Sequence, residues 1–88
     1  MSWVYRFDER ALKELRKLAR PAQQAVLAYL DDRVAGEADP RRFGKGLKGA
    51  LAGLWRYRVE NYRIICQIKD QELVVLIVAV GHRKNIYE

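Results

Sequence analysis

Hydrophobic residues of the first half of the chain recur with periods that predict one strand and two helices. Residues 3–7 alternate bulky aromatic side chains with other residues, which is the two-residue period of a strand with one buried face. Asp8 is a suitable N-cap for a helix, and Pro21 suits the first turn of a second one. Both helices carry apolar stripes at helical spacing, formed by Ala11, Leu12, Leu15 and Leu18 and by Ala22, Val26, Tyr29, Leu30 and Val34.

The second half of the chain predicts a loop and three strands. Glycine and proline punctuate residues 36–53, so this segment is expected to be a loop with one short helical turn. Strands are predicted over 54–59, 62–69 and 72–80, joined by turns at Glu60-Asn61 and Lys69-Asp70-Gln71. The last strand is apolar throughout residues 73–80, which is typical of a strand covered on both faces.

These elements predict an α+β fold of order βααβββ. A helical hairpin is expected to pack on one face of a small, mainly antiparallel sheet. With 88 residues, half of them hydrophobic, the chain has room for a single domain spanning residues 1–88.

The basic excess is concentrated in the second half of the chain. The net charge is +6, and residues 1–40 contain as many acidic as basic side chains, so the whole excess lies in residues 41–88. Such asymmetry indicates an anionic partner, with nucleic acid the first candidate and an acidic protein segment the second.

Several kinds of chemistry lack the residues they need. The chain has no threonine and one serine, Ser2, so a serine triad is not expected. One cysteine and one histidine do not make a zinc site of usual composition, and no cofactor is predicted. Cys66 lies in an apolar run and is expected to be a core residue. Neither a long apolar segment nor a signal-peptide core is present, which predicts a cytoplasmic protein that does not bind membranes.

Arginines alternate with core residues in the first strand of the second half. Trp55, Tyr57 and Val59 are predicted to face the helices, which leaves Arg56 and Arg58 on the opposite face. The neighbouring strands are expected to add Arg63 and Arg83 to that face, with His82 and Tyr87 at its edge. Basic residues on a strand can be no more than a solvated surface. The alternative is a phosphate-binding face, because arginine donates in a planar fork that matches phosphate oxygens.

The sequence resembles the RelE/ParE superfamily of bacterial type II toxins. The resemblance rests on three segments that together run over almost the whole chain: the first helix from Phe7 to Leu18, the paired strands Trp55-Arg56-Tyr57-Arg58-Val59 and Tyr62-Arg63-Ile64-Ile65, and the terminal motif Val80-Gly81-His82-Arg83-Lys84 with Tyr87.

The resemblance is closest to RelE and implies a ribosome-dependent mRNA endonuclease that cleaves the message in the A site of the 30S subunit without a metal. Arg58, Arg83, Tyr87 and His82 are then the expected catalytic residues, and Arg56, Arg63, Lys48 and Lys84 the expected RNA contacts. Tyr87 and His82 both stay candidates for proton transfer, since arginine is a poor proton shuttle. A RelB-like antitoxin, in a toxin–antitoxin hetero-oligomer, is the implied partner.

Two other functions compete with mRNA cleavage. The ParE branch of the superfamily shares the fold and inhibits DNA gyrase. A non-catalytic RNA-binding module is the third possibility, with Trp55 and Tyr57 stacking on bases. Strand alternation argues against this third function, because it turns both rings away from the arginines.

Overall fold

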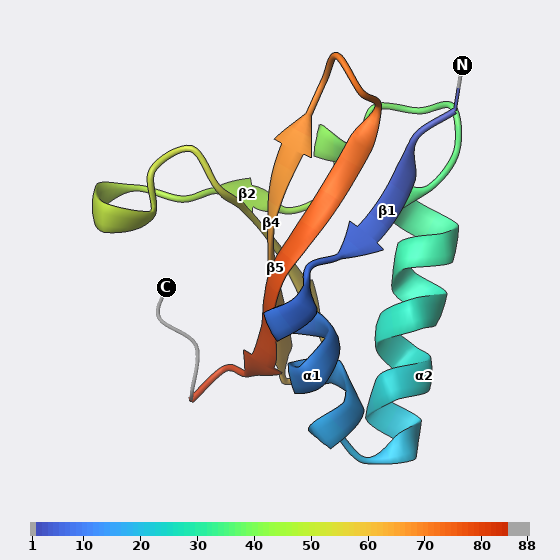
Figure 1. Ribbon diagram of the computed structural model, residues 1–88, viewed down its shortest axis with the longest axis vertical. Helices are drawn as coiled ribbons and strands as arrows, with labels where there is room; N and C mark the ends of the chain where they lie inside the picture. Colours follow the sequence, from blue (N-terminus) through green and yellow to red (C-terminus); the bar gives the residue numbers. More distant parts are fainter. Residues whose placement is uncertain (1, 85–88) are drawn as a thin grey trace.

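Two helices cover one face of a five-stranded mixed sheet (Figure 1). The computed structural model describes residues 2–84. The elements are β1 (Val4–Phe7), α1 (Glu9–Lys17), α2 (Arg20–Tyr29), a π-helical turn (Leu30–Val34), a 3-10 turn (Pro40–Arg42), β2 (Lys45–Gly46), a second 3-10 turn (Gly49–Leu51), β3 (Trp55–Val59), β4 (Tyr62–Lys69) and β5 (Val74–His82). The strand order is β1-β5-β4-β3-β2, with β1 parallel to β5 and every other pair antiparallel.

The predicted α+β fold is confirmed, and so are the expected starts of both helices. Asp8 caps α1 by accepting a hydrogen bond from the backbone N–H of Ala11 at 2.8 Å. Pro21 lies in the first turn of α2, where its missing N–H leaves no helical hydrogen bond unmade. Glu9 and Lys13 form an ion pair one turn apart at 3.6 Å.

The strand β2 is an addition to the predicted order. It lies within the segment 36–53 that was expected to be a loop, and it pairs with Trp55 and Arg56 of β3. Two residues are too few to show a hydrophobic period, so the sequence gives no signal for this strand. The segment also contains two 3-10 turns rather than one helical turn.

The core lies between the sheet and the helices. α1 packs against β5, and α2 packs against β3. Tyr57, Ile64 and Ile77 from the sheet are fully buried, as are Val26 and Leu30 from the helical side. β5 is an interior strand between β1 and β4, as expected, but helices cover only one of its faces, and Leu76, Val78 and Ala79 are half-buried rather than buried. Cys66 is also fully buried, and this burial raises the pKa of its thiol to about 12.

Aromatic residues of β3 hold the preceding turn in place. The Tyr57 hydroxyl donates to the carbonyl of Pro40 at 2.7 Å, and the Trp55 indole donates to the carbonyl of Phe43 at 2.8 Å. A Cβ on Gly44 would stand 2.5 Å from the carbonyl oxygen of Arg56, so only glycine allows this approach. Residues 40–44 are therefore fixed against β3 from both ends.

The connection between β2 and β3 projects from the sheet on the side away from α2 (Figure 1). It carries the second 3-10 turn, Gly49–Leu51. The side of the sheet without helices is therefore bordered by a protruding loop.

Candidate functional site

Two arginines lie directly opposite each other on the face without helices. Arg58 of β3 is the register partner of Arg63 of β4. Tyr57 and Ile64, which neighbour them along the strands, belong to the core beneath the helices. Because side chains alternate along a strand, Arg58 and Arg63 face the other way. The strand register therefore brings together two of the four arginines expected on this face.

A second row lies beside this pair, about 7 Å further along the strands. It contains Arg56, whose partners are Lys45 on β2 and Ile65 on β4. Lys45 was not expected in the site, because it belongs to the short strand that the sequence does not signal. The two rows together place four cationic residues on one region of the sheet: Lys45, Arg56, Arg58 and Arg63.

Burial differs sharply among these side chains. Arg58 is exposed, whereas Arg56 is 8% and Arg63 7% exposed. The alternative of a merely solvated arginine surface therefore does not describe Arg56 and Arg63, which have strand neighbours on both sides. The Arg63 guanidinium donates to the carbonyl of Tyr62 at 3.2 Å. A positive charge that is partly withdrawn from water acts more strongly on a nearby anion, so burial strengthens the field of this site.

Arg83 lies at the same end of the sheet as the arginine pair. Its backbone N–H donates at 2.8 Å to the carbonyl of Asn61, in the turn between β3 and β4. Gly81, the β5 partner of Arg63, adds no side chain to this row. Lys84 follows Arg83 and is exposed.

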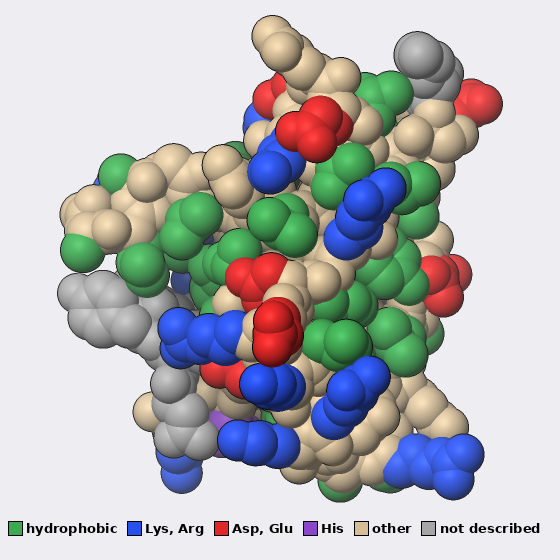
Figure 2. Space-filling model, viewed as in Figure 1, with side chains coloured by type: hydrophobic (Ala, Val, Ile, Leu, Met, Phe, Trp, Pro, Cys, Tyr) green, Lys and Arg blue, Asp and Glu red, His purple; other side chains and the backbone are tan. Residues whose placement is uncertain are grey.

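Acidic residues accompany the basic ones on α1. Arg10 pairs with Glu14 and Lys13 with Glu9, and Figure 2 shows red side chains next to blue ones in this part of the surface. The contrast with the two cationic rows agrees with a basic excess confined to the second half of the chain.

Comparison with known proteins identifies the family. A model of the ParE toxin of type II toxin–antitoxin systems (parDE) matches residues 5–87. The chain belongs to this toxin family. Its expected place in the RelE/ParE superfamily is confirmed.

The relatives of this type II toxin carry RelE-type names. It is 34% identical over 87 residues to toxin RelG of Mycobacterium tuberculosis, covering 99% of this chain and 98% of the relative. It is 31% identical to the mRNA interferase toxin RelE of Escherichia coli, covering 97% and 87% of the two chains. These matches make it a toxin of the RelE family.

Solved structures agree with the fold of the toxin. The RelBE2 toxin–antitoxin complex of Mycobacterium tuberculosis matches with a TM-score of 0.83 and 31% identity, over 94% of this chain and 93% of the other. The isolated Escherichia coli RelE toxin matches with a TM-score of 0.61 and 26% identity, over 91% and 83%. The two-helix, five-stranded arrangement is thus the RelE toxin fold.

His82 is not at the edge of the arginine face of the toxin, where it was expected. On β5 it shares a face with Val80, a core residue, and its ring contacts Tyr62 edge-on with 5.8 Å between ring centroids. Tyr62, Val80 and His82 line a pocket with Glu14 and Lys17 of α1. His82 therefore lies on the helix-covered side, because residues two apart on one strand point the same way.

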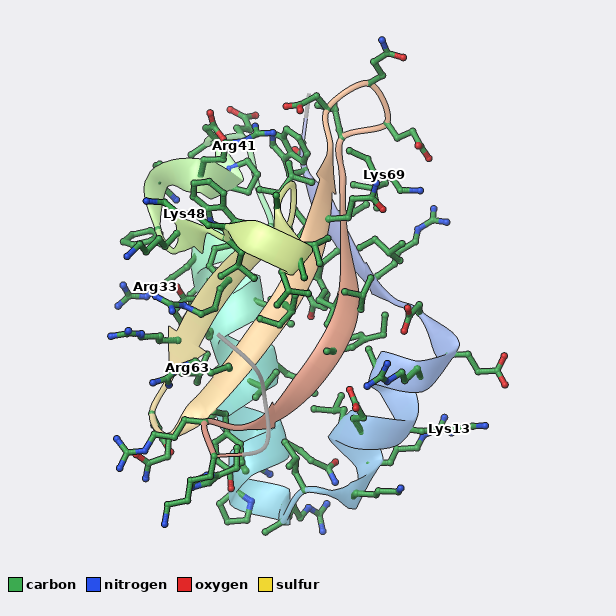
Figure 3. All side chains as sticks on the ribbon, turned by 90° about the vertical axis from the view of Figure 1, so that its left-hand side faces the viewer. Lys13, Arg33, Arg41, Lys48, Arg63 and Lys69 are labelled. Carbon is green, nitrogen blue, oxygen red and sulfur yellow. The ribbon has the colours of Figure 1, made fainter. Side chains whose placement is uncertain are left out.

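The remaining expected site residues of the toxin are dispersed. Lys48 is exposed and lies just before the 3-10 turn of the projecting loop, and Figure 3 shows it on the β2–β3 side of the sheet. Tyr87 lies outside the described residues. The rings proposed for base stacking are engaged elsewhere, since Tyr57 is fully buried and the Trp55 indole is bonded to Phe43. A base-stacking role for them is therefore not supported.

Residues 2–84 of the toxin hold no group of three or more His, Cys, Asp or Glu side chains that could bind a metal ion. None of the helices in this part of the chain is long and apolar enough to cross a membrane.

Proposed function

We propose that this toxin is a ribosome-dependent endoribonuclease that cuts mRNA in the A site of the 30S subunit and so inhibits translation. The observation that carries the proposal is the Arg58–Arg63 pair, with Arg56 in the adjacent row of the same face. A 31% identical relative named an mRNA interferase supports the same class of activity.

The proposed reaction uses the substrate's own 2′-hydroxyl as the nucleophile. The 2′-oxygen gives up its proton to an acceptor and bonds to the adjacent phosphorus, and the bond from phosphorus to the 5′-oxygen breaks. The departing 5′-oxygen takes up a proton. The products are a 2′,3′-cyclic phosphate and a 5′-hydroxyl end, so no redox partner or further reactant is required.

The arginines supply charge in this mechanism rather than protons. Attack on the phosphate adds negative charge to its non-bridging oxygens, and fixed guanidinium groups stabilise that charge where it develops. Arg58 is exposed and can meet the strand directly, whereas the largely buried Arg63 is held in its row. Arginine stays protonated at any working pH, so it cannot accept the 2′-proton. The mechanism assigns no step to a metal ion.

Tyr87 is proposed as the proton acceptor on the family resemblance alone. Arg83 is proposed to contact the scissile phosphate, since its backbone is bonded beside the arginine pair. Lys48 and Lys84, both exposed, are proposed to contact the flanking RNA. His82 is left out of the proposed mechanism because its ring lies on the other side of the sheet.

A RelB-like antitoxin is the proposed partner, in a toxin–antitoxin hetero-oligomer. The RelBE2 relative of known structure is a toxin–antitoxin complex. An acidic antitoxin segment would be attracted by the net charge of +6 and would inhibit by covering the arginines. The cytoplasm, where the ribosome is found, is the proposed location.

A translating-ribosome assay tests the proposed function. Purified toxin is added to a reconstituted translation reaction, and primer extension is expected to reveal new mRNA ends at codons in the A site. Naked mRNA serves as the control for ribosome dependence. DNA gyrase supercoiling is assayed in parallel, because the matching family model is that of a ParE toxin. Intact mRNA together with blocked supercoiling would overturn the proposal in favour of gyrase inhibition.

A further inference from the structure

A groove opens along the edge of β3, next to the arginine rows. It has a volume of about 480 Å³ and lies between the end of α2, the turn 40–44, β2 and β3. Its lining includes Tyr29, Arg33, Phe43, Lys45 and Arg58. We call it the Arg33 groove. Arg33 has no part in the site described above, and Figure 3 shows it on the β2–β3 side of the sheet.

Aromatic rings hold the Arg33 side chain in this groove. Its guanidinium carbon lies 4.9 Å from the centroid of the Phe43 ring and 5.6 Å from that of Tyr29. Arg42 also lies against Phe43, at 5.1 Å. Such cation–π contacts restrict the rotation of a long side chain while leaving its N–H groups available.

The support beneath Arg33 is itself rigid. Phe43 is held through its carbonyl by the Trp55 indole, and Gly44 fits so closely against β3 that no side chain could be added. Binding to a guanidinium that is already positioned costs less side-chain entropy than binding to a free one.

The charges of the groove all have the same sign. Its charged lining residues are basic, and none of the ion pairs within residues 2–84 involves Arg33, Lys45 or Arg58. Arg58 belongs to both the groove and the arginine pair, so the two surfaces are continuous. An anion that extends beyond the arginine pair therefore meets Arg33 and Lys45 next.

We infer that the Arg33 groove binds a backbone phosphate of RNA. A polynucleotide repeats its phosphates along the strand, so a chain held at the Arg58–Arg63 pair can place a further phosphate in the adjoining groove. The planar fork of Arg33 matches two phosphate oxygens, while Lys45 adds a point charge. The inference rests on the proposed function in taking RNA as the anion. The phosphate can belong to the message or to ribosomal RNA.

The test compares two variants with the same change in charge. Arg33→Gln removes the groove cation, and Arg20→Gln removes an exposed arginine at the start of α2. Binding of a fluorescent single-stranded RNA of about twelve nucleotides is followed by anisotropy between about 50 and 200 mM salt. Arg33→Gln is expected to raise Kd about three- to tenfold and to lower the salt slope by about 0.7, while Arg20→Gln stays near wild type.

A second variant, Lys45→Gln, and a second ligand, the 30S subunit, are tested in the same way. Lys45→Gln leaves the aromatic contacts of Arg33 untouched, so it reports on the cationic surface that the groove shares with the Arg56 row even if Arg33→Gln lowers the melting temperature. It is expected to weaken RNA binding as well. Sedimentation with 30S subunits that carry no message distinguishes the two sources. A defect with the oligonucleotide assigns the groove to a message-like strand, and a defect with 30S subunits alone assigns it to ribosomal RNA.

Two results would overturn the inference. One is equal binding of Arg33→Gln and Arg20→Gln to both the oligonucleotide and the 30S subunit, even if the wild-type toxin cleaves mRNA. The other is an equal loss of binding to RNA and to an oligoglutamate peptide, which would indicate unspecific attraction of anions. Failure of mRNA cleavage together with Arg33-dependent RNA binding would instead count against the proposed function and leave the groove assignment standing.

Discussion

The Glu14 carboxylate accepts a hydrogen bond from the backbone N–H of Val80 at 2.9 Å. This contact joins α1 to β5 just beyond the segment in which β5 is paired with β1, which ends at Phe7 and Ile77. The N–H of Val80 therefore lacks a strand partner on that side, and a helix side chain supplies the acceptor instead.

Replacing Glu14 should destabilise the fold through this N–H group. In Glu14→Ala the partly buried donor loses its partner, at a cost of about 1–3 kcal/mol. Glu14→Gln keeps a carbonyl oxygen at the same position and should lose much less. Chemical denaturation of both variants measures the difference, with the exposed Glu9→Ala as the control. Equal stability of Glu14→Ala and Glu9→Ala would contradict this role.

Removing one charge of the arginine pair should separate activity from stability. Like charges directly opposite each other in a sheet repel, so Arg58→Gln is expected to leave the free energy of unfolding unchanged or to raise it by about 0.2–1 kcal/mol. The same change should reduce mRNA cleavage by about a hundredfold or more, because a group that stabilises the transition state is lost.

The Arg58→Gln prediction is checked by single-turnover cleavage and thermal unfolding of the same preparations. Arg20→Gln, which lowers the net charge equally, is the matched control. If Arg58→Gln unfolds the protein, Arg58 is a structural residue and its assignment to catalysis is wrong.

His82 should be dispensable for cleavage. Its ring lies against Tyr62 on the helix side of the sheet, so His82→Gln is expected to cleave at a rate within about twofold of wild type. The ratio of the two rates should stay constant between about pH 5.5 and 7.5. A ratio that changes with pH, at unchanged melting temperature, would return His82 to the mechanism.

The ion pair of Arg41 with Asp70 should make stability depend on acid pH. Two N–H groups of Arg41 donate to the Asp70 carboxylate at 2.9 and 2.7 Å, and these bonds lower the pKa of Asp70. A lowered pKa in the folded state means that the contribution is present above the ordinary carboxyl pKa of about 3.9 and is lost as the pH falls through the lowered value.

Thermal unfolding of wild type and Asp70→Asn between about pH 2.5 and 7 tests this linkage. The variant should melt lower near neutrality, and the two curves should converge at the acid end. Glu72→Gln, which alters an exposed carboxylate at the same turn, is the control. A gap of constant size at every pH would show that Asp70 contributes through something other than its charge.

The rate of mRNA cleavage should not depend on which divalent metal ion is present in solution. Sulfur in place of a non-bridging oxygen weakens contact with Mg²⁺ and favours softer ions such as Mn²⁺. If arginines alone contact this phosphate, a phosphorothioate message should be cleaved at a reduced rate that added Mn²⁺ leaves unchanged. Rescue by Mn²⁺ would indicate a metal ion in the reaction.

The sequence predicts a site residue correctly when that residue lies on a strand long enough to show alternating apolar and polar positions. Tyr57 and Arg58 were assigned to opposite faces because β3 alternates regularly, and the structure confirms this. The same alternation places His82 on the face of Val80. The strand predicted over residues 72–80 ends before His82, so the rule was not applied to it. Lys45 could not be found in this way, because β2 has two residues and no period. The burial of Arg63 depends on neighbouring strands, which a single strand does not specify.

The pairing of β1 with β5 has a consequence for the order of folding. Val4 is the partner of Val74, so the first strand finds its place only after the strand that follows most of the described chain has been made. Until β1 arrives, β5 presents an unpaired edge with free backbone N–H and C=O groups. Such an edge can pair with another chain, so the toxin is most exposed to unwanted strand pairing before its first four-residue strand docks.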